Sequence, residues 1–156
     1  MRKLIPAIAL VILLVGCKPK PGVKPTVEEA AKIVDKAEAS FTTGDTTRIM
    51  EHYAPDAVFF DPGVNDPTRD RATATKWTET FVAMKPTSYS AGDRMLQVLD
   101  AHTIISSGIA TMDISSDKGP TKIRTRYTDV YQQQPDGTWL IVHEHLSNLP
   151  NPAAAR

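Results

Sequence analysis

Apolar positions in the N-terminal half of the chain recur at helical spacing, in segments separated by turn residues. Thr26 and Glu29 form a capping-box pattern at the start of the first segment, and Gly44 is placed to end it. Asp45 can then cap a second, shorter segment. The pattern predicts three helices, at 27–41, from Asp45 through Tyr53, and at about 70–84.

The C-terminal half is rich in Val, Ile, Thr and Tyr, which favour strands, and turn-forming residues interrupt it at intervals. A short apolar strand, Ala57–Asp61, precedes the third helix and is closed by Pro62-Gly63. No proline lies inside a predicted helix or strand. We expect an α+β domain with helices on one face of a curved, mostly antiparallel sheet. The four later strands are predicted at Ser88–Leu99, Thr103–Asp113, Lys122–Gln133 and Thr138–Ser147.

The N-terminus has a pattern typical of a secretory signal. A short cationic start precedes the apolar run Leu4–Val15, which is shorter than the about 20 residues that a membrane-spanning helix needs. The run ends in Leu14-Val15-Gly16-Cys17, which resembles a bacterial lipobox. We therefore expect residues 1–16 to be a lipoprotein signal peptide and Cys17 to be the lipidated mature N-terminus. An ordinary signal peptide with a chance cysteine is the alternative.

Lipidation of Cys17 would give the two or more acyl chains that stable membrane anchoring requires. The proline- and lysine-containing segment 17–25 then reads as a tether, 26–147 as the domain, and 148–156 as a flexible tail. Lys18 favours the outer membrane under the enterobacterial sorting rule. The expected location is the cell envelope, facing the periplasm or the extracellular side.

Composition narrows the class of protein further. The 156 residues include 18 Lys+Arg and 18 Asp+Glu, are 41% hydrophobic and contain one cysteine. One folded domain without an internal disulfide fits these values. The chain lacks the block of basic residues that nucleic-acid binding requires, so we expect no nucleic-acid partner. Removal of residues 1–16 would leave a net charge of about −2.

Several motifs together resemble the nuclear transport factor two-like superfamily, and within it the SnoaL-like domains. The resemblance covers about 27–147 and implies a cone-shaped sheet wrapped around three N-terminal helices, with an apolar pocket for a small ligand. It also implies a homodimer. The motifs that carry it are Phe41-Thr42-Thr43-Gly44-Asp45, the segment from His52 to Val58, Asp61-Pro62-Gly63, and the segment from Asp136 to Ser147.

The superfamily includes ketosteroid isomerase, in which one Asp moves a proton while a Tyr and a protonated Asp hold the oxyanion. The resemblance puts Asp61 at the position of the base and Asp129 near that of the oxyanion-hole acid. Ala37 stands where the family has its Tyr, so steroid isomerisation itself is not expected. Other tyrosines that could substitute are Tyr53, Tyr127 and Tyr131.

Two alternatives remain open for the acidic residues. The apolar neighbours of Asp61, including Phe60, could desolvate it and raise its pKa, but an Asp before Pro-Gly is also a common turn residue. Asp129 could point inward with Thr125 and Tyr127, or outward, because strand alternation alone does not decide. The expected binding residues are Tyr53, Phe60, Trp77, Tyr127, His143 and His145, although Trp77 suits the core equally well.

Strand alternation places His143 and His145 on one face with Ile141, lining either the pocket or an interface. Zinc would need a third ligand, which is absent at motif spacing, so we expect neither metal nor cofactor. Glu144 on the opposite face is expected in solvent or across a dimer.

Two functional hypotheses follow. In one, the protein is anchored in the envelope and binds a small apolar molecule. This hypothesis allows isomerase- or lyase-like proton transfer by Asp61 and Asp129. In the other, the domain is a non-catalytic dimerisation or docking module, because the same fold hosts both.

Overall fold

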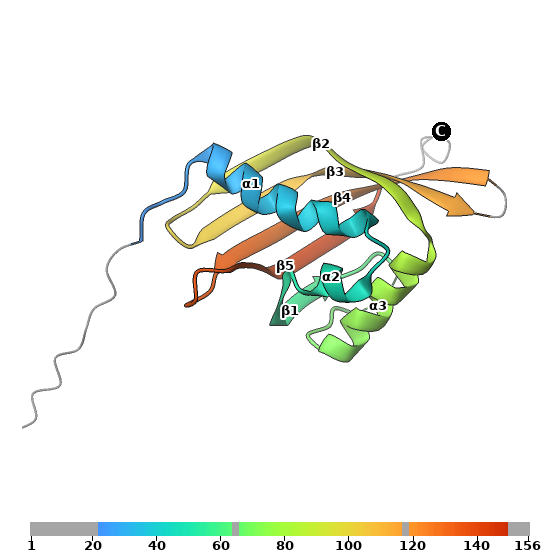
Figure 1. Cartoon of the computed structure of the whole chain (residues 1–156), viewed down its shortest axis with the longest axis horizontal. Coiled ribbons are helices and arrows are strands. Elements are labelled where there is room, and N and C mark those ends of the chain that lie inside the picture. Colours follow the sequence, from blue (N-terminus) through green and yellow to red (C-terminus); the bar gives the residue numbers. More distant parts are fainter. Residues whose placement is uncertain (1–21, 64–65, 117–118, 150–156) are drawn as a thin grey trace, which may run out of the picture.

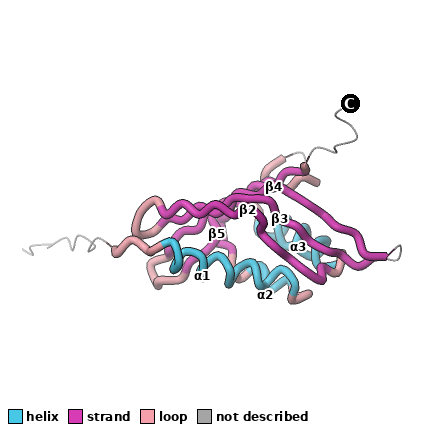
Figure 2. The backbone as a smooth tube through the Cα atoms, turned by 90° about the horizontal axis from the view of Figure 1, so that it is seen from above, coloured by secondary structure: helices cyan, strands magenta, loops and turns pink. Residues whose placement is uncertain are grey.

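A computed structural model describes residues 22–63, 66–116 and 119–149, which form one sheet with helices against one of its faces (Figures 1 and 2). The helices are α1 (Val27–Glu38), continued by a 3-10 turn over Ala39–Thr42, α2 (Thr46–Met50) and α3 (Arg71–Ala83). None of the described helices is long and apolar enough to cross a membrane.

The first two helices begin where the capping residues predicted. The Thr26 hydroxyl accepts the backbone N–H of Glu29, and the Glu29 carboxylate accepts the N–H of Thr26, which completes the capping box of α1. Asp45 caps α2 and Asp70 caps α3 in a similar way. Gly44 adopts a positive φ of 69°, which allows the sharp reversal between the 3-10 turn and α2.

The five strands form one sheet in the order β1-β5-β4-β3-β2, in which β1 runs parallel to β5 and every other pair is antiparallel. The predicted α+β class, with its mostly antiparallel sheet, is therefore confirmed. The strands are β1 (Tyr53–Phe60), β2 (Pro86–Val98), β3 (Thr103–Ser116), β4 (Gly119–Gln133) and β5 (Trp139–Asn148).

The prediction for the segment around Pro55 was wrong. The second helix ends at Met50 rather than Tyr53, and Pro55 lies inside β1 instead of between elements. A proline is tolerated there because β1 is an edge strand, and its register with β5 shifts between Tyr53 and Val58. The edge position removes the need for the N–H that proline lacks.

The core lies between the helices and the face of the sheet that they cover, called here the inner face. Val34 of α1, Ile104 of β3, and Tyr131 and Ile141 of β4 and β5 are almost fully buried there. On β4 the buried positions alternate strictly, since Thr125, Tyr127, Asp129 and Tyr131 all point inward. The inward alternative for Asp129 is thus the correct one.

A β-bulge bends β2 over the helices, as Figure 1 shows. The register with β3 shifts between Gly92 and Met95, and Asp93 takes a positive φ of 52°. Gly108 of β3 lies directly under this bend: a Cβ there would come within 3.1 Å of the Gly92 carbonyl oxygen. The bend therefore depends on a residue without a side chain, and it carries the first half of β2 toward the pocket.

Candidate functional site

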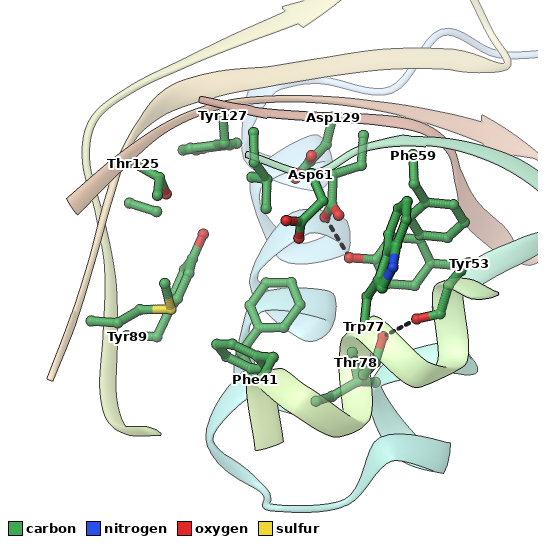
Figure 3. A pocket seen from close by; sticks show the side chains of 17 residues that line it. Phe41, Tyr53, Phe59, Asp61, Trp77, Thr78, Tyr89, Thr125, Tyr127 and Asp129 are labelled. Atoms are coloured by element: carbon green, nitrogen blue, oxygen red, sulfur yellow. Dashed lines mark hydrogen bonds between the residues drawn. The ribbon is translucent and has the colours of Figure 1, made fainter. Parts of the chain in front are cut away.

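A cavity of about 110 Å³ opens between the inner face of the sheet and helices α2 and α3 (Figure 3). This is several times the roughly 10–15 Å³ that one water molecule occupies, so the cavity has room for a small organic molecule. Most of its wall is apolar or aromatic. The lining residues are Phe41, Ile49, Tyr53, Phe59, Asp61, Ala74, Trp77, Thr78, Phe81, Tyr89, Ala110, Met112, Thr125, Tyr127, Asp129, Glu144 and Leu146.

Aromatic rings form one end of the pocket. Phe41, in the 3-10 turn, packs edge-to-face against Phe81 of α3 at a centroid distance of 6.2 Å. It also packs against the tilted ring of Tyr89 of β2 at 5.0 Å. Arg71 fixes the position of α3, because its guanidinium donates to the carbonyl oxygens of Met50, Tyr53 and Ala54. This end of the pocket is therefore a preformed aromatic surface.

Two carboxyl groups lie side by side in the opposite wall. Asp129 of β4 and Glu144 of β5 are direct partners in the antiparallel ladder, and both line the pocket. Directly opposed residues have Cβ atoms about 4.5–5.5 Å apart, so the two side chains interact. Asp129 is 4% exposed, and its Oδ1 has no hydrogen-bond partner among the described residues. The pocket wall thus contains a residue with a buried, unpaired carboxyl oxygen.

Tyr53 is bound to one member of this pair. Its hydroxyl donates a 2.5 Å hydrogen bond to Glu144 Oε2 (Figure 3). Burial raises the pKa of Glu144 to about 7, although the Tyr53 hydrogen bond lowers it and the nearby Asp61 adds to the rise. Burial, together with the charges of Glu144 and Glu38, raises the pKa of Asp129 well above its usual value. The pocket therefore favours the protonated form of both acids more than water does, and Glu144 titrates near neutral pH.

Asp61 combines the two roles that the sequence left open. Its Oδ1 accepts the backbone N–H of Gly63 at 2.7 Å, which is the turn contact, and its side chain also lines the pocket. Figure 3 shows the carboxyl groups of Asp61 and Asp129 gathered near one another, away from Phe41. Three acidic side chains, Asp61, Asp129 and Glu144, therefore share one region of the cavity.

The prediction that His143 and His145 lie on the same face of the last strand as Ile141 was wrong. His143 and His145 pair with Val58 and Phe60 of β1, and neither histidine lines the pocket. A β-bulge at Val142 explains this, because Tyr131 pairs with Ile141 whereas Val130 pairs with His143. The extra residue shifts the alternation by one, so Ile141 faces inward while His143 faces outward.

Because of the same bulge, the prediction that Glu144 lies in solvent or at a dimer contact was also wrong. Glu144 instead points into the pocket beside Asp129. On the opposite side of the sheet, called the outer face, Phe60 packs against the rings of His143 and His145 at 5.5 and 5.3 Å. The predicted binding role of Phe60 therefore has no support from its position, since it is 37% exposed and outside the pocket.

The other predicted binding residues do line the cavity. Tyr53, Trp77 and Tyr127 contribute from β1, α3 and β4. The Tyr127 hydroxyl lies 3.2 Å from that of Ser106, and burial raises its pKa to about 12. No group of three His, Cys, Asp or Glu residues placed to hold a metal ion occurs within 22–63, 66–116 and 119–149. Cys17, the predicted signal, most of the predicted tether and most of the predicted tail lie outside the described residues.

Residues 31–152 match the SnoaL-like domain family, and the chain belongs to it. The predicted resemblance to SnoaL-like, nuclear transport factor two-like domains is therefore confirmed. No curated protein matches the sequence.

Solved structures share the fold. A proposed calcium/calmodulin-dependent protein kinase II association domain from Xanthomonas campestris is 28% identical, with a TM-score of 0.73 over 81% of this chain and 90% of that one. A proposed ketosteroid isomerase from Parabacteroides distasonis is 16% identical, with a TM-score of 0.66 over 83% and 92% of the two chains. A nuclear transport factor 2-like protein from Salmonella enterica is 16% identical, with a TM-score of 0.67 over 80% and 92%.

Proposed function

We propose that this protein is an envelope lipoprotein, anchored through acylated Cys17, whose SnoaL-like domain binds a small, largely apolar molecule in the pocket. The observation that carries the binding role is the pairing of Asp129 with Glu144 in the wall of a largely apolar cavity. A few convergent polar groups in a preformed apolar cavity are what orient a bound ligand. Lys18 supports an outer-membrane location, facing the periplasm or the cell exterior.

The acidic groups also support proton-transfer chemistry on the bound molecule. A general acid or base works best when its pKa is near the working pH, and Glu144 has a pKa of about 7. Ionised Glu144 would take a proton from one atom of the ligand and return it to another, which is an isomerisation with no change in composition. Protonated Asp129 would donate a hydrogen bond to developing negative charge, and Asp61 is a second candidate base.

A ligand screen on the purified full-length protein tests the binding role. The screen measures thermal stability with small steroids, polyketide fragments, terpenoids, aromatic amines and short acids. A ligand at 100 times its dissociation constant stabilises the folded state by about 2.7 kcal/mol. Ala110→Leu should abolish the shift, because Ala110 is 3% exposed and lines the cavity, whereas the control Ala83→Leu at the exposed end of α3 should retain it. Absence of any shift across the screen would overturn the binding role.

Hydrogen exchange into the ligand separates catalysis from simple binding. In D₂O near pH 7, a bound ligand with an acidic C–H should acquire deuterium, and Glu144→Gln should stop the exchange while binding persists. Exchange at the wild-type rate in each of Glu144→Gln, Asp129→Asn and Asp61→Asn would leave binding as the only function of the pocket.

A second candidate is an assembly module, favoured by the 28% identity to a proposed association domain. The outer face would form the contact, since Met95 is 63% exposed there and Phe60 lies on the same side of the sheet. Sedimentation of the full-length protein in detergent should show a homodimer that Met95→Lys weakens. A monomer at all concentrations would exclude this candidate.

A further inference from the structure

The pocket has an unusual balance of charged groups. Its lining holds three acidic side chains and no Lys, Arg or His, and the structure describes every one of the 17 lining residues. No salt bridge within 22–63, 66–116 and 119–149 involves Asp61, Asp129 or Glu144. The pocket therefore offers negative charge and no positive charge to a ligand.

A ligand carboxylate or phosphate would find only like charge at this site. A neutral apolar molecule would fill the aromatic end but leave Asp129 Oδ1, which is buried and has no hydrogen-bond partner, unsatisfied. A donor group on the ligand would remove that penalty. The strongest donors for a carboxylate are charged N–H groups.

The aromatic part of the lining points to the same chemistry. Rings of Trp, Tyr and Phe attract a cation placed over their faces, and tryptophan does so most strongly. Trp77 and Tyr53 lie next to the acidic region, while Phe41 lines the far end (Figure 3). Phe81 packs against Phe41 there. One end of the pocket thus suits a cationic nitrogen and the other suits an aromatic or aliphatic body.

We propose that the pocket binds an organic amine in its ammonium form, with the nitrogen between Asp129 and Glu144 and the apolar body against Phe41, Phe81 and Tyr89. This inference rests on the proposed small-molecule function and specifies its ligand class. Ammonium N–H groups bind Asp129 Oδ1 and the free oxygen of Glu144, and the rings enclose the rest of the molecule. Asp61 lies close enough to add its charge.

Binding of an ammonium ion should release protons, because it favours the ionised form of the acidic pair. Glu144 has a pKa of about 7, so below pH 7 the affinity for the amine should fall about ten-fold per pH unit. Near pH 6, calorimetry in buffers of different ionisation heat should detect about one proton released per amine bound. The lining residues of α2 and α3 do not titrate. The titratable groups that face the pair are Tyr53 and Asp61 from β1 and the loop after it, Tyr89 from β2, Tyr127 and Tyr131 from β4, and Glu38 from α1.

Three probes of similar shape test the inference by calorimetry on the full-length protein in detergent: 2-phenylethylamine, 2-phenylethanol and 3-phenylpropanoate. The amine should bind at least about ten-fold more tightly than the alcohol, and the acid should bind most weakly. The double variant Asp129→Asn/Glu144→Gln should lose at least about ten-fold in amine affinity and no more than about two-fold in alcohol affinity. Asp56→Asn, at an exposed position on β1, is the matched control and should bind all three probes as the wild type does.

The outcomes separate this inference from the function on which it rests. If the alcohol or the acid binds as tightly as the amine, the pocket function stands and the ammonium inference fails. If the amine binds equally well to the double variant, the acidic pair does not hold it and the inference also fails. Failure of every probe overturns the ammonium inference, and the broader ligand screen then decides the binding role independently.

Discussion

The Tyr53 hydroxyl donates a hydrogen bond to Glu144, 91 residues away in the sequence, and this contact joins the edge strand β1 to the acidic pair in the pocket. The Tyr53 ring also packs against Phe59 at 5.0 Å, so it is held on both sides. A buried hydrogen bond to an ionised group stabilises the ionised form. Tyr53 therefore keeps the pKa of Glu144 lower than burial alone would set it.

Tyr53→Phe should raise the pKa of Glu144 above 7, because the variant loses the hydrogen bond that favours the carboxylate. At pH 8, where wild-type Glu144 is mostly ionised, we expect the free energy of unfolding to fall by about 1–2 kcal/mol. Carboxyl ¹³C NMR measures the pKa, and urea unfolding measures the stability. Tyr89→Phe is the control, since no hydrogen bond joins Tyr89 to Glu144. An unchanged Glu144 pKa in Tyr53→Phe would show that the contact does not form in solution.

Stability should decrease as pH rises from about 4.5 to 7, because in this window folded Glu144 holds a proton that the unfolded chain releases. Its pKa rises from 4.5 to about 7 on folding. This shift contributes about 3 kcal/mol to the free energy of unfolding below pH 4.5, and the contribution is lost above pH 7. Asp129 has the same sign of shift.

Glu144→Gln removes this dependence, so its stability should exceed that of the wild type by up to about 3 kcal/mol at pH 8 and match it near pH 4. Urea unfolding at pH 4, 6 and 8 measures the difference. Glu79→Gln, an exposed carboxyl on α3, is the control and should change stability by less than about 0.5 kcal/mol at each pH. Equal stability of wild type and Glu144→Gln at pH 8 would contradict the raised pKa.

Local sequence signals predicted most of the elements. Thr26 and Asp45 each start a helix, and the Pro135-Asp136-Gly137 turn separates β4 from β5. These signals are local contacts between a side chain and nearby backbone groups, so they are visible in the sequence. Pro55 was misread because its effect depends on β1 being an edge strand, which is a property of the whole sheet.

The site could be predicted only where strand alternation is unbroken. On β4 the alternation holds, so the sequence narrowed Asp129 to two orientations, and the burial of Tyr127 and Tyr131 in the structure selects the inward one. On β5 the bulge at Val142 reverses it, which exchanged the roles of Glu144 and His143. A bulge arises from the pairing of two strands, and no residue in Ile141-Val142-His143 marks it. Glu144 could be identified as a pocket residue only once the strand pairing is known, because that pairing places it opposite Asp129.

Cys17→Ser should abolish acylation and release the protein from the membrane, because stable anchoring requires acyl chains on that residue. Mass spectrometry of the mature N-terminus and membrane fractionation measure the two effects. The domain itself should keep its pocket affinity, since the nearest described helix begins only at Val27. Cys17→Ser protein that still fractionates with the membrane would refute the lipobox prediction.

Arg94 joins β2 to α1 through two carboxylates of different exposure. Its Nη1 lies 2.6 Å from Asp35 Oδ1 and 3.2 Å from Glu38 Oε2. The Glu38 side chain is 12% exposed and that of Asp35 is 58% exposed. Burial raises the pKa of Glu38, and the charge of Arg94 opposes that rise. The buried carboxylate therefore depends on this one guanidinium far more than the exposed one does.

Arg94→Gln should destabilise the protein by about 3 kcal/mol at pH 7, because it leaves Glu38 buried without a cation. The loss should shrink toward pH 4, since the raised pKa of Glu38 lets it protonate there, and Arg94→Gln/Glu38→Gln should recover most of the stability at pH 7. Asp35→Asn should cost less than about 1 kcal/mol, because that carboxylate remains in solvent. Thermal unfolding at both pH values measures all three variants, and a pH-independent loss in Arg94→Gln would mean that packing of the Arg94 stem, rather than charge, holds α1 against β2.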